Sequence, residues 1–322
     1  MKKRFIILSI IAIILILTIF ITDFTGLKGK KVTVSVPQGS GAKEIATLLK
    51  DNHVIGFPFL FLQYIEKDAM HLKAGVHTFN ERMGYEDALT ELKRDVPLEN
   101  TVSITIPEGY ETREIRDLLA DKGVVSKEHF DAACRTAHET FVFLPPDGNV
   151  EGYLFPATYT FQVGSDAKQI VHTMLKTFEN KLYTNENINR LNELGLSFHE
   201  ALTLASIIER EAAMDSERAT VSSVFHNRMR IGMRLESCAT VQYVLKERKD
   251  ILAIQDTKID SPYNTYIHEG LPPAPISSPG ENSFKAALYP SDTNYLFFVA
   301  DGTGGHAFSE TYEGHLNAAN SN

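Results

Sequence analysis

The stretch Ser197-Phe-His-Glu-Ala-Leu-Thr-Leu-Ala-Ser-Ile-Ile-Glu-Arg-Glu211 carries the strongest structural signal in this chain of 322 residues. Ser197 is followed three residues later by Glu200, which is the spacing of a capping box. In that motif each side chain bonds the backbone N–H of the other residue, so a helix is predicted to begin here. Apolar residues then recur at helical spacing as far as about Met214.

This helix carries two glutamates near its end, and the helical period separates them. At about 100° per residue, Glu211 shares its face with Ile207 and Ile208. Glu209 points about 160° away from it. A carboxyl group on an apolar face is desolvated, which favours the protonated form that a general acid needs. The alternative is a frayed helix end whose glutamate reaches water or an arginine such as Arg218, and periodicity alone leaves both open.

A second helix and a long loop are predicted after this helix. The second helix is expected to start near Asp215 and Ser216 and to run through Met229. Residues 262–290 contain six of the 13 prolines, so this stretch is expected to be an ordered loop, neither regular helix nor central strand. The apolar run Tyr295–Ala300 then predicts a buried strand, and residues 302–306 predict a turn.

The N-terminal half has a different pattern, which is strand, turn and helix. Alternating valines predict a half-buried strand over residues 32–36, and a Pro-x-Gly turn leads into a helix from about Ala42 to Lys50. Residues 32–55 align without a gap on residues 102–125. Either two unrelated units share these residues because proline and glycine turns and leucine-rich helix faces are common, or a small α+β module is duplicated. In both cases residues 31 to about 140 are predicted to lack a catalytic centre.

The N-terminus is predicted to anchor the chain in a membrane. Residues 1–4 include three basic side chains, and the run Phe5–Thr22 that follows contains no charge. Eighteen helical residues span about 27 Å, close to the thickness of a bilayer core. Because no Ala-x-Ala-like site follows, an uncleaved anchor is favoured over a cleaved signal. Residues 1–4 are then cytoplasmic and the rest of the chain is outside, beyond a short basic tether at Lys28–Lys31.

Composition excludes several classes of protein. A hydrophobic fraction of 43% and a charged fraction of 23% exclude disorder over most of the length. The formal net charge of −9, which becomes −11 without the first 27 residues, disfavours nucleic acid as a partner. Cys134 and Cys238 are too few for a disulfide framework or a structural zinc site.

Several familiar catalytic motifs are absent from the sequence. His199-Glu200 lacks the second histidine of a zinc protease motif. Ser40-x-x-Lys43 and Ser165-x-x-Lys168 lack the companion motifs of penicillin-binding enzymes. There is no nucleophile elbow, phosphate loop or dinucleotide fingerprint. The residues therefore indicate acid/base chemistry by carboxylates or no catalysis, and no metal or cofactor is predicted.

Aromatic and amide residues cluster in two places. Tyr153, Phe155 and Tyr159 flank Pro156, and Tyr263-Asn-Thr-Tyr266 precedes the proline-rich stretch. Aromatic faces with neighbouring polar groups suit sugar rings, because the faces stack on pyranoses and the polar tips meet hydroxyls. They could equally be core aromatics with polar edges.

At these residues the sequence resembles the endolytic murein transglycosylases of the MltG/YceG-like family, which are membrane-anchored bacterial enzymes that cut peptidoglycan glycan strands. The resemblance runs from the anchor to the C-terminus. It rests on an ordered set of motifs: Glu151-Gly-Tyr-Leu-Phe-Pro156, Ala205-Ser-Ile-Ile-Glu-Arg-Glu211, Val224-Phe-His-Asn-Arg-Met229, Gly232-Met-Arg-Leu235, Thr240-Val-Gln-Tyr243, Ser261-Pro-Tyr-Asn-Thr-Tyr266, Gly270-Leu-Pro-Pro273, Phe298-Val-Ala300 and His306-Ala-Phe308.

The resemblance implies an α+β protein with a transmembrane helix over residues 5–22. A small LysM-like domain would occupy residues 31–100, and a mixed α+β YceG-like catalytic domain residues 101–322. The family's catalytic glutamate carries over onto Glu211. The residues of these motifs expected to contact substrate are Glu151, Tyr153, Glu209, Asn227, Thr240, Gln242, Tyr243, Tyr263, Asn264, Tyr266 and His306.

The reaction implied by the resemblance is cleavage of the β-1,4 bond between N-acetylmuramic acid and N-acetylglucosamine, with formation of 1,6-anhydro ends. The implied partners are glycan strands, the cytoplasmic membrane, and peptidoglycan synthases with the division or elongation machinery, beside which the enzyme would end nascent strands. Two alternatives stay open: a hydrolase that uses water, and a non-catalytic wall-binding or division scaffold.

Overall fold

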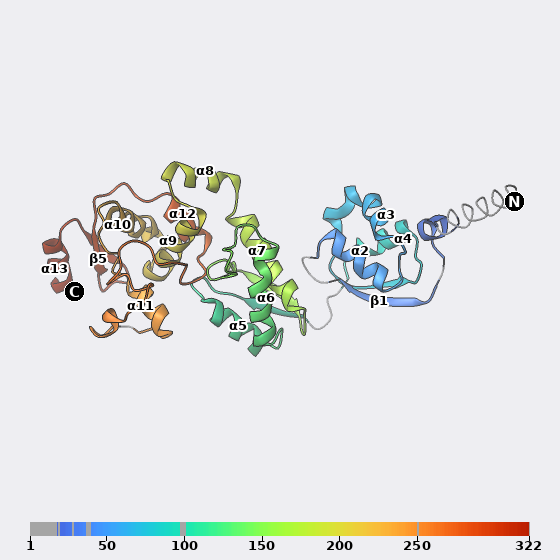
Figure 1. Cartoon of the computed structure of the whole chain (residues 1–322), viewed down its shortest axis with the longest axis horizontal. Helices are drawn as coiled ribbons and strands as arrows, with labels where there is room; N and C mark the ends of the chain where they lie inside the picture. The colour runs from blue at the N-terminus through green and yellow to red at the C-terminus, as the bar shows by residue number, and fades with distance from the viewer. Residues whose placement is uncertain are drawn as a thin grey trace, which may run out of the picture. The chain divides into compact units, whose positions relative to one another are not determined.

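The computed structural model of the chain describes residues 18, 20–27, 29–36, 40–96, 101–249 and 251–321. It is a mixed α+β protein that is mostly helical (Figure 1). Its described strands form three two-stranded sheets. The chain divides into two compact units, Met1–Ser103 with Thr160–Ser165 and Ile104–Tyr159 with Asp166–Asn322. The boundary passes through the paired strands β3 (Thr101–Thr105) and β4 (Thr158–Gln162).

The first unit is a two-stranded antiparallel sheet with helices. Its elements are β1 (Lys31–Val36), α2 (Ala42–Asp51), α3 (Pro58–Tyr64), η1 (Glu66–His71), β2 (Gly75–Asn80) and α4 (Tyr85–Leu92). Val34 and Val36 are buried, as the alternation along β1 predicts, and they pack in one cluster with Ile45 and Leu49 of α2. The predicted strand and helix are therefore confirmed. Residues 37–39 of the predicted turn lie outside the described residues.

The predicted membrane anchor falls largely outside the described residues, because residues 1–17 and 19 are not described. Residues 20–25 are helical. Across the ranges that the structure describes, no helix combines the length and the apolar character needed to cross a membrane.

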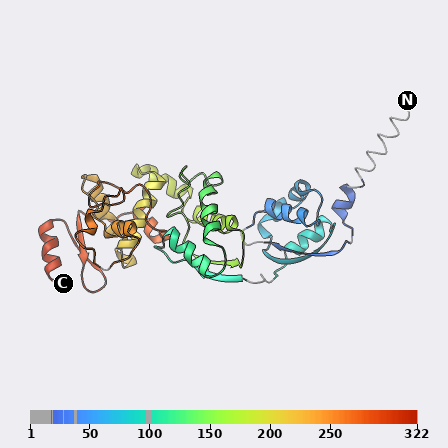
Figure 2. The ribbon, with the colours of Figure 1, turned by 60° about the horizontal axis from the view of Figure 1, so that its bottom comes forward.

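The second unit is built around the helix that the capping box predicts. Its elements are α5 (Thr112–Asp121), α6 (Lys127–Thr136), η2 (Ala137–Glu139), α7 (Ala167–Lys181), α8 (Asn185–Leu194), α9 (Phe198–Glu211), η3 (Asp215–Glu217), α10 (Arg218–Arg230), α11 (Cys238–Leu245), η4 (Asp256–Lys258), α12 (Glu281–Leu288), β5 (Phe297–Ala300), β6 (His306–Ser309) and α13 (Tyr312–Ser321), together with parts of β3 and β4. Helices α10, α11 and α12 pack on α9, and they stay grouped around it in the turned view (Figure 2).

The capping box forms as predicted. The Ser197 hydroxyl accepts a hydrogen bond from Glu200 N, and the Glu200 carboxylate accepts one from Ser197 N at 2.8 Å. Residues 201–208 of α9 are all buried, so this helix is the centre of the second unit. The second predicted helix is confirmed as α10, and a short 3-10 turn, η3, precedes it.

Two predictions for the C-terminal region are wrong in part. Helix α12 lies inside the proline-rich stretch, because Pro279 and Pro290 flank it and none of its eight residues is a proline. Strand β5 begins at Phe297 and is half-buried rather than buried. It pairs with β6 in a two-stranded hairpin, and so small a sheet cannot enclose its own side chains.

The strand and the helix of each repeated unit are also present among the described residues. Strand β3 precedes α5 as β1 precedes α2. At the ends of the two helices, Val54 N donates to Leu49 O at 2.8 Å, and Val124 N donates to Leu119 O at 3.1 Å. These four aligned residues are buried, so the correspondence extends from the sequence to local packing.

Candidate active site

Glu211 is the last residue of α9, and its carboxylate faces the start of α11. Its Oε1 atom accepts hydrogen bonds from Ser237 Oγ at 2.5 Å and from Ala239 N at 3.1 Å. Ala239 belongs to the first turn of α11, where backbone N–H groups have no partner within the helix. Arg218 bonds Glu209 and Asp215 instead of Glu211. The end of α9 is therefore fixed by α11 and is not frayed.

Buried hydroxyl groups hold Ser237 in place behind Glu211. Ser237 N donates to Thr265 Oγ1 at 3.0 Å, and Thr240 Oγ1 donates to Ser237 O at 2.8 Å. All three residues are at most 2% exposed. Within the described ranges Oε2 of Glu211 has no hydrogen-bond partner. One carboxylate oxygen of Glu211 is thus held in place by the start of α11.

Neutral donors lie beside this carboxylate. Cys238 Sγ lies 3.1 Å from Tyr266 Oη, and both residues neighbour Glu211. Desolvation raises the pKa of the Cys238 thiol and of the Tyr266 hydroxyl, and the charge of Glu211 adds to both effects. Both groups are therefore protonated near neutral pH and can donate hydrogen bonds to a polar ligand.

Glu209 lies in a separate, internal ion-pair cluster. Its Oε1 accepts from Arg218 Nη1 at 3.1 Å and its Oε2 accepts from Gly280 N at 2.9 Å. Arg218 Nε also donates to Asp215 at 2.7 Å. Burial raises the pKa of the nearby Glu108, and the charge of Glu209 adds to this effect. Glu209 therefore ties α9 to α10 and to the turn before α12, and its predicted contact with substrate stays a prediction.

Glu151, Tyr243 and Tyr263 form a second group of predicted substrate contacts. Glu151 Oε1 accepts from Thr112 N at 2.9 Å, and Oε2 lies 3.5 Å from Tyr243 Oη. The rings of Tyr243 and Tyr263 are 5.0 Å apart. Glu151 is buried, which raises the pKa of its carboxyl group to about 7, and the nearby charge of Glu111 adds to the shift.

This raised pKa makes stability depend on pH in a defined direction. Because Glu151 binds its proton more tightly in the folded state, its contribution to stability is full below about pH 4.5 and is lost as pH rises through about 7. The stability lost over this pH interval is about 3 kcal/mol. We expect the free energy of unfolding of the wild type, relative to the Glu151→Gln variant, to fall by about this amount over the interval in urea titrations. If the difference in free energy of unfolding between the wild type and Glu151→Gln did not change with pH, the raised pKa of Glu151 would be contradicted.

The other predicted contacts have partners within the fold. Gln242 Oε1 accepts from Arg210 Nη2 at 3.2 Å, so Gln242 lies close to the residue that precedes Glu211. The remaining residues bond loops or other side chains: Asn227 donates to Thr293 O and Tyr295 O, Asn264 donates to Thr257 O and Ile259 O, Tyr153 Oη lies 2.8 Å from His199 Nδ1, and His306 Nδ1 lies 2.9 Å from Glu217 Oε2. These bonds position the loops of the second unit, and their predicted contacts with substrate stay untested.

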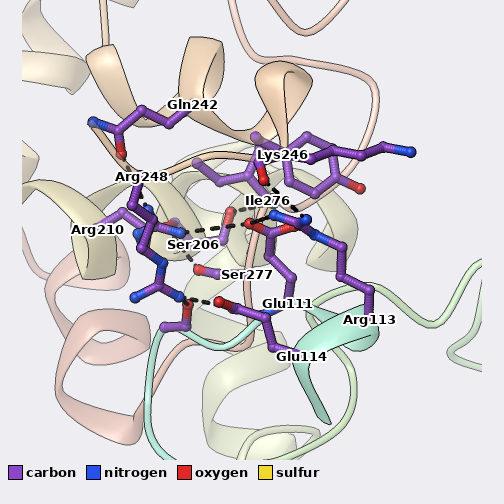
Figure 3. A network of polar contacts seen from close by, with 12 residues as sticks. Glu111, Arg113, Glu114, Ser206, Arg210, Gln242, Lys246, Arg248, Ile276 and Ser277 are labelled. Carbon is purple, nitrogen blue, oxygen red and sulfur yellow. Dashed lines mark hydrogen bonds and ion pairs between the residues drawn. The ribbon is translucent and has the colours of Figure 1, made fainter. Parts of the chain in front are cut away.

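A network of arginines and glutamates around Arg210, the residue that precedes Glu211 in α9, was missed by the sequence analysis (Figure 3). Arg113 forms a bidentate pair with Glu111, with N–O distances of 2.5 and 3.0 Å, and Arg210 Nη1 lies 3.8 Å from the same carboxylate. Arg113 also donates to Lys246 O at 3.1 Å, and Arg248 donates to Glu114 at 2.7 Å. The start of α5 is thereby tied to the end of α11.

This network and Glu211 together fix both ends of α11. Glu211 bonds its first turn, while Arg113 bonds the backbone of Lys246, the residue that caps its C-terminus. A carboxylate at a helix N-terminus and a cation at its C-terminus both interact favourably with the helix dipole. No group of three or more His, Cys, Asp or Glu side chains in the described part of the chain is arranged to hold a metal ion.

The fold and site belong to a defined class of protein. The model of the YceG-like family matches residues 34–321, so the chain belongs to this family, as the sequence motifs predict. The chain is also similar to a crystal structure of a YceG-like protein from Listeria monocytogenes, with a TM-score of 0.61 and 33% identity over 90% of this chain and 99% of that one.

Relatives of the chain are named as endolytic murein transglycosylases, which are enzymes. The endolytic murein transglycosylase of Bacillus subtilis strain 168 is 34% identical over 305 residues, which cover 89% of this chain and 83% of that protein. The endolytic murein transglycosylase of Streptococcus pneumoniae strain D39 is 30% identical over 309 residues. The match covers 87% of this chain and 56% of that longer relative.

Proposed function

We propose that this protein is an endolytic peptidoglycan lytic transglycosylase. It cleaves the β-1,4 bond between N-acetylmuramic acid and N-acetylglucosamine and leaves 1,6-anhydro ends. The proposal rests on how the carboxyl group of Glu211 is held. Its Oε1 atom accepts hydrogen bonds from Ser237 and Ala239, while Oε2 has no partner in the described part of the chain. The names of the curated relatives support the choice of substrate.

Glu211 performs both proton transfers in this reaction. Protonated on Oε2, it donates its proton to the glycosidic oxygen as the bond to C1 of the muramic residue breaks. The resulting carboxylate then takes the proton of the muramic C6 hydroxyl, whose oxygen attacks C1 and closes the anhydro ring. Glu211 ends protonated and no water is consumed. One carboxylate suffices, because the substrate supplies its own nucleophile in an intramolecular step.

The neighbours of Glu211 support the intermediate stage of the reaction. After the first transfer the negative charge resides on the carboxylate, where the Ser237 hydroxyl and Ala239 N–H donate charge-assisted hydrogen bonds. Tyr266 and Cys238, protonated near neutral pH, offer donors for sugar hydroxyl and amide groups. Because the exported part carries a net charge of −11, recognition of an anionic wall has to rest on such neutral contacts.

We also propose that the protein is a single-pass membrane protein with its catalytic domain outside the cell. The uncharged run Phe5–Thr22, with basic residues before it, supports this localisation. The first unit would be a LysM-like domain that binds glycan, since it combines a two-stranded sheet with helices. Acting at the membrane, the enzyme would end nascent strands beside the synthases and the division or elongation machinery.

Digestion of purified glycan strands tests the proposal. The expected products carry 1,6-anhydro-N-acetylmuramic acid ends, which mass spectrometry separates from hydrolysis products that are heavier by one water, about 18 Da. Products with the extra water would establish a hydrolase instead. Binding of peptidoglycan without release of any product would establish a scaffold.

A further inference from the structure

The helical residues 20–25 are built into the core of the first unit and are not joined to it by a loose tether. Asp23 is 9% exposed, and its carboxylate accepts hydrogen bonds from Gly56 N at 2.5 Å, Phe57 N at 3.1 Å and Tyr85 Oη at 2.6 Å. Burial and the hydrogen bond to Asp23 raise the pKa of Tyr85, so this phenol remains a donor. Three bonds to one buried carboxylate fix the orientation of the segment.

The chain after this helix is fixed as well. Leu27 N donates to Arg82 O at 2.7 Å, and Gly29 N donates to Glu81 O at 3.1 Å. Gly26 has φ +83°, and a Cβ there would lie 2.4 Å from Gly84 N, so the two backbones approach as closely as glycine allows. The described residues of the predicted basic tether therefore pair with the first unit, and that part of the sequence analysis is wrong.

Apolar side chains from this helix and from α3 share one surface. Phe20 stacks on Phe57 with ring centroids 4.6 Å apart, and Phe24 meets Tyr64 edge-on at 5.5 Å. Between these elements lies a hollow of about 430 Å³, lined by Phe20, Ile21, Phe24, Thr25, Leu60 and Tyr85. We call Phe20, Ile21, Phe24, Leu60 and Tyr64 the apolar patch.

The apolar patch is open and carries no charge. Phe20, Ile21, Phe24 and Tyr64 are between 39% and 59% exposed. Contiguous exposed apolar groups often mark a surface that contacts a partner or a membrane. Phe20 and Ile21 also belong to the end of the uncharged run Phe5–Thr22, the proposed membrane anchor. The lipid bilayer is therefore the surface expected next to the apolar patch.

We propose that the apolar patch rests in the interfacial zone of the lipid bilayer that anchors the chain, so that the first unit is held directly against the membrane surface. The inference rests on the membrane anchor proposed above. If residues 5–22 span the bilayer, residues 20–22 lie at its surface, and each helical residue adds only about 1.5 Å. Because Asp23 fixes this helix to the unit, Leu60 and Tyr64 of α3 are brought to the same depth. Aromatic side chains favour that depth.

A single tryptophan reports on this depth, because the chain contains no tryptophan of its own. The full chain carrying Tyr64→Trp is reconstituted into vesicles of phosphatidylethanolamine and phosphatidylglycerol. The matched control is Thr47→Trp, on the exposed face of α2 that also carries Lys43 and Lys50. We expect the emission of the Tyr64→Trp protein to shift to shorter wavelength and to be quenched by lipids brominated near the headgroup. The emission of the control should show neither effect.

Flotation of the same vesicles separates this inference from the anchor itself. If both proteins float with the vesicles but their tryptophans respond alike, the anchor stands and the docked patch is refuted. If neither protein floats, the anchor fails and the inference fails with it. Cleavage of glycan strands by the Tyr64→Trp protein is measured alongside, so that failure of the proposed reaction is recorded independently.

Discussion

Replacement of Glu211 by Gln is expected to reduce glycan cleavage by about 10²–10⁴-fold, the range that general acid–base catalysis contributes. An amide cannot give a proton to the glycosidic oxygen. The carbonyl oxygen of glutamine can still accept the bonds from Ser237 Oγ and Ala239 N, so the contact between α9 and α11 is kept. The release of anhydro-muropeptides, followed by mass spectrometry, measures the loss, and thermal unfolding checks that the fold is intact.

Glu209→Gln is the matched control, because it makes the same chemical change two residues away on the opposite side of α9. Glu209 bonds Arg218 and Gly280, so this variant is expected to lose stability while cleavage stays measurable. If Glu211→Gln still released anhydro-muropeptides, the catalytic assignment would be wrong. If both variants lost glycan cleavage equally, the loss would be explained by damage to α9 as a whole and not by the carboxyl group of Glu211.

Replacement of Arg218 by Met is expected to lower the free energy of unfolding by about 3–5 kcal/mol, the loss typical of a buried ion pair that keeps one partner. The side chains of Arg218 and Glu209 are 10% and 6% exposed, so Glu209 would be left buried beside Glu108 without a cation. Methionine keeps much of the length and removes the charge. Urea unfolding followed by circular dichroism measures the change.

The double variant Glu209→Gln/Arg218→Met separates the ion pair from the packing of the arginine stem. Removing the stranded carboxylate should restore part of the lost stability, as a double-mutant cycle detects. A loss below about 1 kcal/mol in Arg218→Met, the value of an exposed ion pair, would show that the cluster is solvated and contradict this account.

Local patterns predicted the central helix and the separation of its two glutamates. The Ser197–Glu200 capping box depends on residues three apart, and the faces of Glu209 and Glu211 follow from the helical period alone. Such features are written in short stretches of sequence. They are therefore visible before any tertiary contact is known, and both are confirmed in the structure.

The partners of Glu211 could not be read in the same way. Ser237 and Ala239 follow it by 26 and 28 residues, and Arg113 reaches Lys246 across 133 residues. These contacts depend on where α10 and α11 turn back in space, which no short pattern encodes. Helix α12 was missed for a different reason: counting prolines over the whole stretch ignores the ten proline-free residues between Pro279 and Pro290, and eight of them form this helix.

The path of the chain through the two units has a consequence for how such a protein can be altered. The chain leaves the first unit after Ser103, returns to it for Thr160–Ser165, and then leaves it again. A deletion of residues 1–103 would leave that returning segment without its neighbours. A transfer of the first unit to another protein would therefore have to carry residues 160–165 together with residues 1–103. A graft onto another scaffold, or a recombination event in evolution, would need breakpoints on both sides of residues 160–165.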